Sequence, residues 1–273
     1  MSAAPGTARP DRSAKTTGSE ARRIADALLR AQSDRTPIPP FTRKLPYLRV
    51  ETAYEAQSLV VEHRLQAGEQ VIGMKLGLTS RVKRHALGIH EPVFGRLTSG
   101  MVVPHGEALA LDTLIHPRAE PEIAFLIRDR IAAPTTIAQV LAATEAVFAA
   151  IEVVDSRYSE PFRLPDSVAD NAGAARVVVG ARGRRPDALV DLSVLGCVFR
   201  CRGATDTAAG GAVMGHPAAA LVWLAGALAT RGECVEPGSI VLSGGLTASV
   251  PLPARGVVIA EFDGLGSIGV HCA

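Results

Sequence analysis

The sequence lacks most of the features that mark membrane proteins and nucleic-acid-binding proteins. Aromatic residues make up only 4% of the 273 residues and tryptophan occurs once, which argues against base stacking on aromatic side chains. The 29 lysines and arginines are balanced by 27 acids, so no basic excess points to nucleic acid or to an anionic membrane. No apolar run is expected to reach the roughly 18 residues of a membrane span. The sequence therefore predicts neither a nucleic-acid partner nor a membrane partner.

Cysteine is also scarce, and none of the four cysteines forms a CxxC pair with another. In a chain of this length, four thiols are too few for a disulfide framework, so we interpret them as reduced and the protein as cytoplasmic. The first 18 residues have no apolar segment of the signal-peptide kind. Their polar composition predicts a disordered leader over residues 1–18, although their shortage of acids also fits a transit peptide.

Several motifs of common enzyme classes are missing as well. Gly244-Gly245 and Gly264-Leu-Gly266 do not form the GxGxxG of a dinucleotide site, and no GxxxxGK[ST] occurs. Ser243 lacks the GxSxG context of a hydrolase elbow, and the seven histidines show no HExxH spacing. These absences exclude a nucleotide-binding fold, a serine triad and a zinc site on motif grounds. We interpret the glycines as residues of turns or of close backbone approach.

The remaining composition is that of an ordinary globular protein, with 47% hydrophobic and 21% charged residues. Capping residues, glycines and prolines predict four helices. These helices begin at Ser19, Thr52, Thr136 and Pro217, and they end before Pro37, near Gly68, near Ala150 and before Gly232. Runs of β-type residues predict strands over residues 71–75, 122–127, 151–154, 176–179, 239–242 and 257–262.

The order of these elements predicts an α+β fold, because helices and strands do not alternate in a regular βαβ rhythm. Helices come first, and a strand-rich body with two inserted helices follows. Residues 19–68 are expected to form a small N-terminal helical lobe on that body. No flexible linker separates the two, so residues 19–273 are predicted to form a single domain.

Three glutamates are the most informative candidates for chemistry. Glu120 and Glu122 are two residues apart, so on an extended segment their side chains point to the same face. Glu152 lies in a run that otherwise reads as a buried strand, where a carboxylate is costly unless it is paired or bound to metal. Together they would make a hard oxygen site suited to Mg²⁺ or Mn²⁺. The alternative is a solvated strand face for Glu120 and Glu122, with Glu152 paired to Arg157 or Arg118.

Lys75 is the second candidate, because it ends an apolar, strand-like run. Burial there would depress the pKa of its ammonium group and suit it to proton transfer or oxyanion stabilisation. A lysine at a strand end also commonly extends its charge into solvent, and Lys75 taken alone favours that interpretation.

Several short segments, taken in order, resemble those of the hydratase/decarboxylase family of the fumarylacetoacetate hydrolase superfamily. The resemblance extends from about Ile24 to the C-terminus, and the number, order and spacing of the segments make it specific. The segments are Gly73-Met-Lys75-Leu-Gly-Leu-Thr-Ser80, Glu120-Pro-Glu122-Ile, Glu152-Val-Val-Asp155-Ser-Arg157-Tyr158, Val168-Ala-Asp170-Asn171-Ala, Gly215-His-Pro217, Ser243-Gly-Gly-Leu-Thr-Ala-Ser-Val-Pro251 and Gly264-Leu-Gly-Ser267.

This resemblance implies a fold and a set of site residues. The fold would be a mixed β-sheet roll of the fumarylacetoacetate hydrolase type. Glu120, Glu122 and Glu152 would hold Mg²⁺ or Mn²⁺, and a 2-oxo acid would chelate the ion through its keto oxygen and adjacent carboxylate. Lys75 would be catalytic, stabilising the negative charge that develops on that oxygen. Substrate-binding roles would fall to Ser80, Val93, Ser99, Asp155, Arg157 and Asp170.

The resemblance also implies an activity in aromatic meta-cleavage catabolism. The leading expectation is a metal-dependent lyase that decarboxylates an unsaturated 2-oxo diacid, 2-oxo-3-hexenedioate, to 2-hydroxypenta-2,4-dienoate and CO₂. The alternative is hydration of 2-hydroxypenta-2,4-dienoate. Hydratases of the family commonly carry an acid in the loop where this chain has Val93, which favours decarboxylation. Ser99 stands where relatives often have an aspartate, so this position defines the identity of the substrate less narrowly.

Members of the family are expected to form homo-oligomers, and its decarboxylases to associate with a sister hydratase. A non-catalytic partner subunit is therefore a third hypothesis. The presence of Lys75 and of all three glutamates argues against it, because a scaffold has no need of clustered carboxylates. A diacid substrate also needs its distal carboxylate held, for which Ser99, Arg96 or Arg157 could donate hydrogen bonds.

Overall fold

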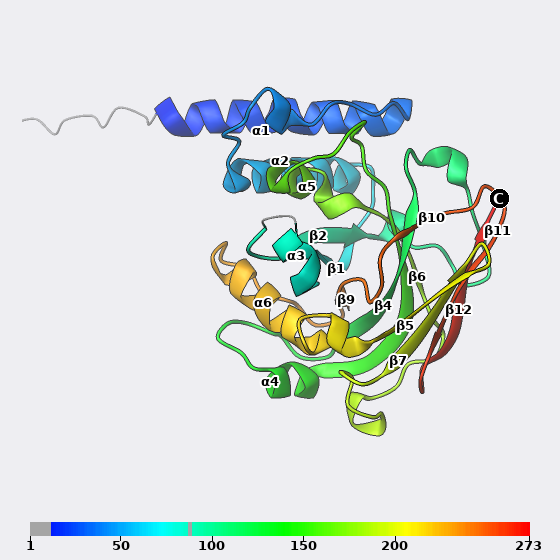
Figure 1. The fold of residues 1–273 in the computed structure, drawn as a ribbon. Coiled ribbons are helices and arrows are strands. Elements are labelled where there is room, and N and C mark those ends of the chain that lie inside the picture. Colours follow the sequence, from blue (N-terminus) through cyan, green and yellow to red (C-terminus); the bar gives the residue numbers. More distant parts are fainter. Residues whose placement is uncertain (1–11, 87–88) are drawn as a thin grey trace, which may run out of the picture.

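A computed structural model describes residues 12–86 and 89–273 of the chain (Figure 1). A layer of helices lies along one side of a strand-rich body, and most of the remaining helices lie on the body's flank (Figure 1). This α+β arrangement agrees with the fold class expected from the sequence.

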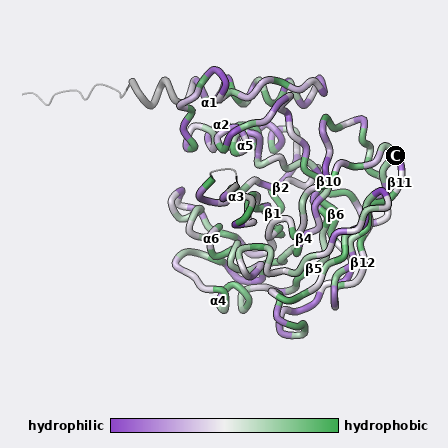
Figure 2. Tube along the Cα trace, viewed as in Figure 1, coloured by the Kyte–Doolittle hydropathy of each residue, from purple (hydrophilic) through white to green (hydrophobic). Residues whose placement is uncertain are grey.

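The helical layer consists of α1 (Arg12–Asp34), α2 (Val50–Gln66) and the short α5 (Leu164–Ala169). Ile24 and Leu28 are buried on α1, four residues apart, so that one stripe of this helix faces the protein. In Figure 2 this helix alternates between purple and green, as expected when only one face is apolar. Helix α1 packs on α2, and α2 packs on α5.

Both N-terminal helices begin earlier than their predicted caps. Helix α1 begins at Arg12 instead of Ser19, because the residues before Ser19 include good helix formers such as Ala14 and Lys15. Residues 1–11 of the predicted leader lie outside the described residues. The capping box predicted at Thr52 is wrong, since α2 begins at Val50 and Thr52 is buried within its first turn.

The strands form two mixed sheets. The order in the seven-stranded sheet is β2 (Val93–Thr98), β1 (Val71–Gly77), β9 (Ile240–Leu242), β4 (Arg118–Ile127), β5 (Thr144–Val154) and β6 (Ala174–Val179), and β10 (Val250–Pro251) also pairs with β4. The order in the five-stranded sheet is β3 (Ala108–Leu109), β12 (Gly266–Cys272), β11 (Gly256–Phe262), β7 (Gly196–Cys201) and β8 (Ala204–Ala209). Strand β12 packs against β5, which joins the two sheets.

The six predicted strands are all present, although several are longer than expected. The largest error concerns the third predicted helix, which begins as expected at the Thr136 cap, whose hydroxyl accepts a bond from the Gln139 N–H at 3.3 Å. This helix, α4 (Ile137–Ala142), stops at residue 142, and β5 follows. The alanines of this segment suit either structure locally, but antiparallel pairing with β4 along the whole segment favours the strand.

Helix α6 (Pro217–Ala229) agrees with the prediction, and its N-cap His216 accepts a hydrogen bond at Nδ1 from the Ala218 N–H at 3.0 Å. It belongs to the apolar stretch Gly210–Ala229, whose 20 residues are long and apolar enough by composition for a membrane span. The expectation that no such run exists was therefore wrong. A helix of 13 residues is only about 20 Å long, however, and Leu221 and Leu224 on it are fully buried in the core.

Candidate metal and substrate site

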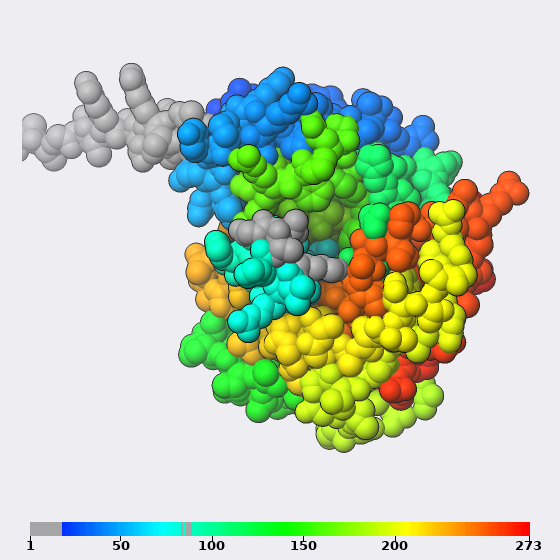
Figure 3. Space-filling view, in the orientation of Figure 1, coloured from blue at the N-terminus to red at the C-terminus, as the bar shows by residue number. Residues whose placement is uncertain are grey.

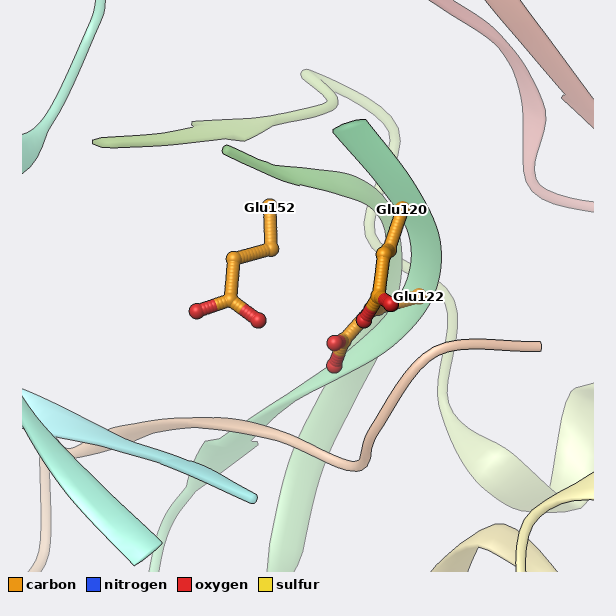
Figure 4. A group of neighbouring side chains, drawn as sticks. All are labelled: Glu120, Glu122 and Glu152. Atoms are coloured by element: carbon orange, nitrogen blue, oxygen red, sulfur yellow. The ribbon is translucent and has the colours of Figure 1, made fainter. Parts of the chain in front are cut away.

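The three glutamates meet on one face of the antiparallel pair formed by β4 and β5. Glu120 is the register partner of Glu152, and Glu122 follows two residues later on the same face. One carboxylate oxygen from each side chain lies within 4.8 Å of those of the other two. Figure 4 shows Glu120 and Glu122 descending from one strand while Glu152 faces them. The convergence predicted from spacing is confirmed, and the solvated-face alternative is wrong for Glu122.

Glu122 and Glu152 are fully buried, whereas Glu120 is half-buried. The Gly244 N–H donates to Glu122 Oε2 at 2.7 Å. Among the described residues, Glu122 Oε1 and Glu152 Oε1 have no hydrogen-bond partner. Burial raises the pKa of both groups, and the negative charge of Glu152 raises that of Glu122 further. Acids in this situation need either protons or a cation.

The backbone beside the glutamates approaches neighbouring side chains so closely that two of its residues must be glycines. A Cβ at Gly245 would lie 2.6 Å from Glu120 Oε2, and one at Gly244 would collide with Thr79 Oγ1. The expectation that these glycines serve close backbone approach is confirmed. Three carboxylates, two of them with unpartnered buried oxygens, fit a hard divalent cation such as Mg²⁺ or Mn²⁺. Figure 3 shows this face of the molecule hollowed between green and orange segments of the chain.

Lys75 reaches the same cluster from β1. Its Nζ lies 3.0 Å from Glu152 Oε2 and donates to the Ala172 carbonyl at 2.9 Å, and the residue is buried. The strand-end alternative, with the charge in solvent, is therefore wrong. Burial alone would lower the pKa of Lys75, but Glu152 and the other two glutamates outweigh burial and raise it. The expected depressed pKa is thus corrected: the group is held as an ammonium ion.

Val93, the first residue of β2, lies near Lys75. The position a Cβ would take on Gly77 is 3.0 Å from Val93 Cγ2 and 3.8 Å from Lys75 Nζ, so both side chains flank that position. Val93 is buried. The cluster therefore has an apolar wall next to its cation.

Two residues expected to hold substrate lie elsewhere. Lys75 is the register partner of Gly95, and Ser99 is four residues farther along, about 13 Å at the usual strand rise. Ser99 is exposed, and its Oγ accepts a hydrogen bond from the Gln70 N–H at 3.0 Å. Arg96 stands on the opposite face from Gly95 and pairs with Glu233 at 2.6 Å. Strand alternation and register thus exclude both side chains from the glutamate cluster.

The other predicted substrate residues are engaged with protein groups. The Asp155 carboxylate accepts from the Ile115 N–H at 3.0 Å and from the His116 N–H. The Arg157 side chain pairs with the Asp170 carboxylate and donates to the Asp170 carbonyl at 2.6 Å, and both residues are buried. Burial raises the pKa of Asp170 to about 6 despite the arginine.

Ser80 follows Thr79 at the start of α3 (Arg81–Ala86), where its carbonyl accepts from the Arg84 N–H at 3.0 Å. Thr79 packs against Gly244, so Ser80 lies one residue from the backbone that binds Glu122. The substrate-binding roles of Ser80, Asp155, Arg157 and Asp170 stay predictions.

Sequence reasoning assigned no role to Asn171 and Ala172, although both lie in the Val168-Ala-Asp170-Asn171-Ala segment. Ala172 supplies the carbonyl that binds the Lys75 ammonium group, and Asn171 holds the turn in which Ala172 lies. The signal was weak, because a carbonyl contact carries no side-chain signature. An asparagine directly before an alanine and a glycine is nevertheless typical of a left-handed turn.

No family model matches the chain. It is 41% identical over 221 residues to a 4-oxalocrotonate decarboxylase of Pseudomonas sp., an alignment that covers 80% of this chain and 85% of the relative. It is also 41% identical over 209 residues to a 2-hydroxypent-2,4-dienoate hydratase of Pseudomonas putida, covering 75% of this chain and 94% of the relative.

The chain belongs to the hydratase/decarboxylase family. A solved structure of 4-oxalocrotonate decarboxylase from Pseudomonas putida G7, complexed with magnesium and adipate, matches with a TM-score of 0.87 and 32% identity, covering 98% of this chain and 100% of that one. A fumarylpyruvate hydrolase from Pseudomonas aeruginosa, in complex with Mn²⁺ and pyruvate, matches with a TM-score of 0.58 at 15% identity, covering 73% of this chain and 88% of that one. The second likeness shows the shared fold alone.

Proposed function

We propose that this family member is a divalent-metal-dependent decarboxylase that converts 2-oxo-3-hexenedioate to 2-hydroxypenta-2,4-dienoate and CO₂ in the meta-cleavage catabolism of aromatic rings. The observation that carries the proposal is the buried Lys75 beside three clustered glutamates and an apolar Val93. The relatives named 4-oxalocrotonate decarboxylase support the substrate class, at 41% and 36% identity.

Glu120, Glu122 and Glu152 would hold the ion, with Mg²⁺ or Mn²⁺ as the candidates. The unpartnered buried oxygens of Glu122 and Glu152 support this assignment, and so do similar solved structures, which are complexed with magnesium, calcium or Mn²⁺. When bound, the ion would supply Lewis-acid polarisation of the substrate's 2-oxo group.

Lys75 would stabilise the negative charge that develops on the substrate's 2-oxo oxygen during decarboxylation. When the C5–C6 bond breaks, its electron pair moves through the C3–C4 double bond toward the 2-oxo oxygen, and CO₂ leaves. A fixed ammonium group in a buried site stabilises that oxygen's negative charge more strongly than water would. Because Lys75 is buried, donates to the Ala172 carbonyl and is ion-paired with Glu152, its charge is already held in place before the substrate arrives.

Val93 would decide between the two reactions of the family. Hydration of an alkene needs a water molecule and a group that moves its protons. Valine supplies no such group, and a buried apolar side chain beside Lys75 helps to exclude water. Ser99 is exposed and lies outside the glutamate cluster, and its expected substrate-binding role stays a prediction.

The hydratase alternative rests on a specific observation, namely that a hydratase relative is as similar, at 41% identity, as a decarboxylase relative. Incubating the purified, Mg²⁺-loaded chain separately with 2-oxo-3-hexenedioate and 2-hydroxypenta-2,4-dienoate discriminates the two. We expect CO₂ release from the diacid and little hydration of the dienoate. Efficient hydration without CO₂ release would assign the chain as a hydratase, and neither reaction would favour the non-catalytic partner.

Further predictions, some from the sequence itself and some from the resemblance, concern the whole protein. They are one domain over residues 19–273 with a helical lobe over 19–68, a cytoplasmic location, a homo-oligomer and association with a sister hydratase. Core packing supports the single domain, because buried residues of α1 and α2 belong to the same hydrophobic cluster as those of the sheets. Gel filtration of the chain alone and with the hydratase tests the assembly.

A further inference from the structure

The turn between α5 and β6 has an uncommon backbone. Asn171, Ala172 and Gly173 have φ values of 52°, 52° and 73°, all in the left-handed region. Glycine adopts this region freely and asparagine tolerates it, but alanine does not favour it. Three consecutive residues in this conformation persist only where the surroundings hold them, and such strain commonly marks a functional site.

The conformation has a direct consequence for Lys75. It aims the Ala172 carbonyl at Lys75 Nζ, which donates to it at 2.9 Å, while Glu152 Oε2 lies 3.0 Å from the same nitrogen. An ammonium group has three N–H donors on a flexible stem. With one N–H donated to the Ala172 carbonyl and the charge held beside the Glu152 carboxylate, the orientation of the ammonium group is restricted.

Asn171 holds this turn against β2. Its Oδ1 accepts from the Arg96 N–H at 2.8 Å, and its Nδ2 donates to the Arg96 carbonyl at 2.9 Å. Arg96 directly follows Gly95, the register partner of Lys75. A Cβ at Gly95 would collide with the Asn171 carbonyl, so the turn reaches this strand only because the residue is glycine.

We propose that Asn171 is a positioning residue for Lys75. Its side chain fastens the left-handed turn to β2, the Ala172 carbonyl and the Glu152 carboxylate then hold the ammonium group in place, and a remaining N–H is available to the substrate's 2-oxo oxygen. The buried Arg157–Asp170 pair secures the residue before the turn. This inference rests on the proposed role of Lys75 in turnover.

The first test compares Asn171→Ala with Arg202→Ala. Arg202 also has a φ of 52° but is exposed on the β7–β8 hairpin, so the second variant places alanine in the same backbone conformation away from the site. We expect Asn171→Ala to lower kcat at least tenfold, with KM and Mg²⁺ affinity changed less than threefold. Arg202→Ala should keep kcat within twofold. Equal kcat values for the two variants would overturn the proposal.

Asn171→Gly separates the side chain from the backbone. Glycine adopts the left-handed conformation without strain but makes neither bond to Arg96. We therefore expect kcat to fall at least tenfold here too. Wild-type kcat in Asn171→Gly would show that the backbone conformation alone suffices and that the asparagine side chain positions nothing.

A double-mutant cycle asks whether Asn171 acts through Lys75. Asn171→Ala should lower kcat in the wild-type background and leave the residual rate of Lys75→Met unchanged within twofold. An equal loss in both backgrounds would assign Asn171 a general structural role. A crystal structure of Asn171→Ala gives a readout without activity: we expect the Lys75 Nζ–Ala172 carbonyl contact to be broken, and an intact contact contradicts the proposal.

The wild-type assay keeps this inference distinct from the proposed function. If the wild-type protein released no CO₂ from the diacid, the decarboxylase assignment would fail. The same variants would then be compared in the hydration reaction, and the crystal structure would still decide whether Asn171 places Lys75.

Discussion

Glu122 is a proposed metal ligand that is fully buried and bound to the Gly244 N–H through only one of its oxygens. Glu122→Gln removes one negative charge with almost no change in shape. We expect Mg²⁺ affinity to fall at least roughly tenfold and CO₂ release to be lost, because an amide is a weaker ligand for a hard cation. Isothermal titration with Mg²⁺ measures the first effect. Unchanged affinity would remove Glu122 from the ligand set.

Asp170 allows a prediction about pH. Its pKa is raised from an ordinary value of 3.8 to about 6, chiefly by burial. The folded protein therefore holds a proton that the unfolded chain has lost, so the stabilisation from this group is complete below pH 3.8 and disappears as the pH rises through about 6. At 1.36 kcal/mol per pKa unit, the effect is at most roughly 3 kcal/mol.

Denaturant unfolding of the wild type and of Asp170→Asn between pH 4 and pH 7 checks this. The free energy of unfolding of the wild type, relative to the variant, should decrease over that interval. An increase with pH would mean that the ion pair with Arg157 dominates and that the pKa of Asp170 is lowered instead.

The sequence predicted the positions of some site side chains, but not the pKa or position of others. The two-residue spacing of Glu120 and Glu122 determined their common face, and the polar residue in an apolar run identified Glu152. The pKa of Lys75 could not be predicted in the same way, because its direction depends on three carboxylates that only the folded sheet brings to it. Ser99 was misplaced because motif position says nothing about strand register.

At the scale of elements, the loop after β9 connects the sheet to the metal site. Gly244 has a φ of 111°, its N–H binds Glu122, and a Cβ there would collide with Thr79. Gly238, just before β9, has a φ of 81° but open space around it. Both Gly244→Ala and Gly238→Ala therefore strain the backbone, but only the alanine at 244 also collides with Thr79.

We expect Gly244→Ala to weaken Mg²⁺ binding at least roughly tenfold, because the displaced loop loses its bond to a metal-ligating carboxylate. Gly238→Ala should lower stability by about 1 kcal/mol or more from backbone strain and leave Mg²⁺ affinity unchanged. Thermal unfolding and metal titration of both variants separate the effects. Equal metal affinities would show that the loop does not support the site.

Pairing between elements also explains where the secondary-structure predictions failed. Residues 144–150 were assigned to the helix that begins at the Thr136 cap, yet they belong to β5. The deciding interactions are pairings with β4 and β6, which lie far away in the sequence. By contrast, α6 was predicted well because its proline at the first turn and its apolar residues are local signals.

At the scale of the whole molecule, the order of strands in the sheet is what brings the site residues together. Strands β4 and β5 place the glutamates, while β1, with β9 lying between it and β4, brings Lys75 to them. The family resemblance supplied this assembly in advance, whereas the periodicity of the sequence alone gave an α+β fold without its connections. The site is thus a property of the sheet, and in our proposal its chemistry depends on a divalent ion bound by the three carboxylates.

The dependence of CO₂ release on metal occupancy tests that central claim most directly. The protein is stripped with excess chelator, dialysed and titrated with Mg²⁺, while CO₂ release from 2-oxo-3-hexenedioate is followed at each step. We predict no release from the stripped protein and a rate that rises in proportion to bound Mg²⁺, reaching its maximum at one ion per chain. Full CO₂ release in excess chelator would contradict the account.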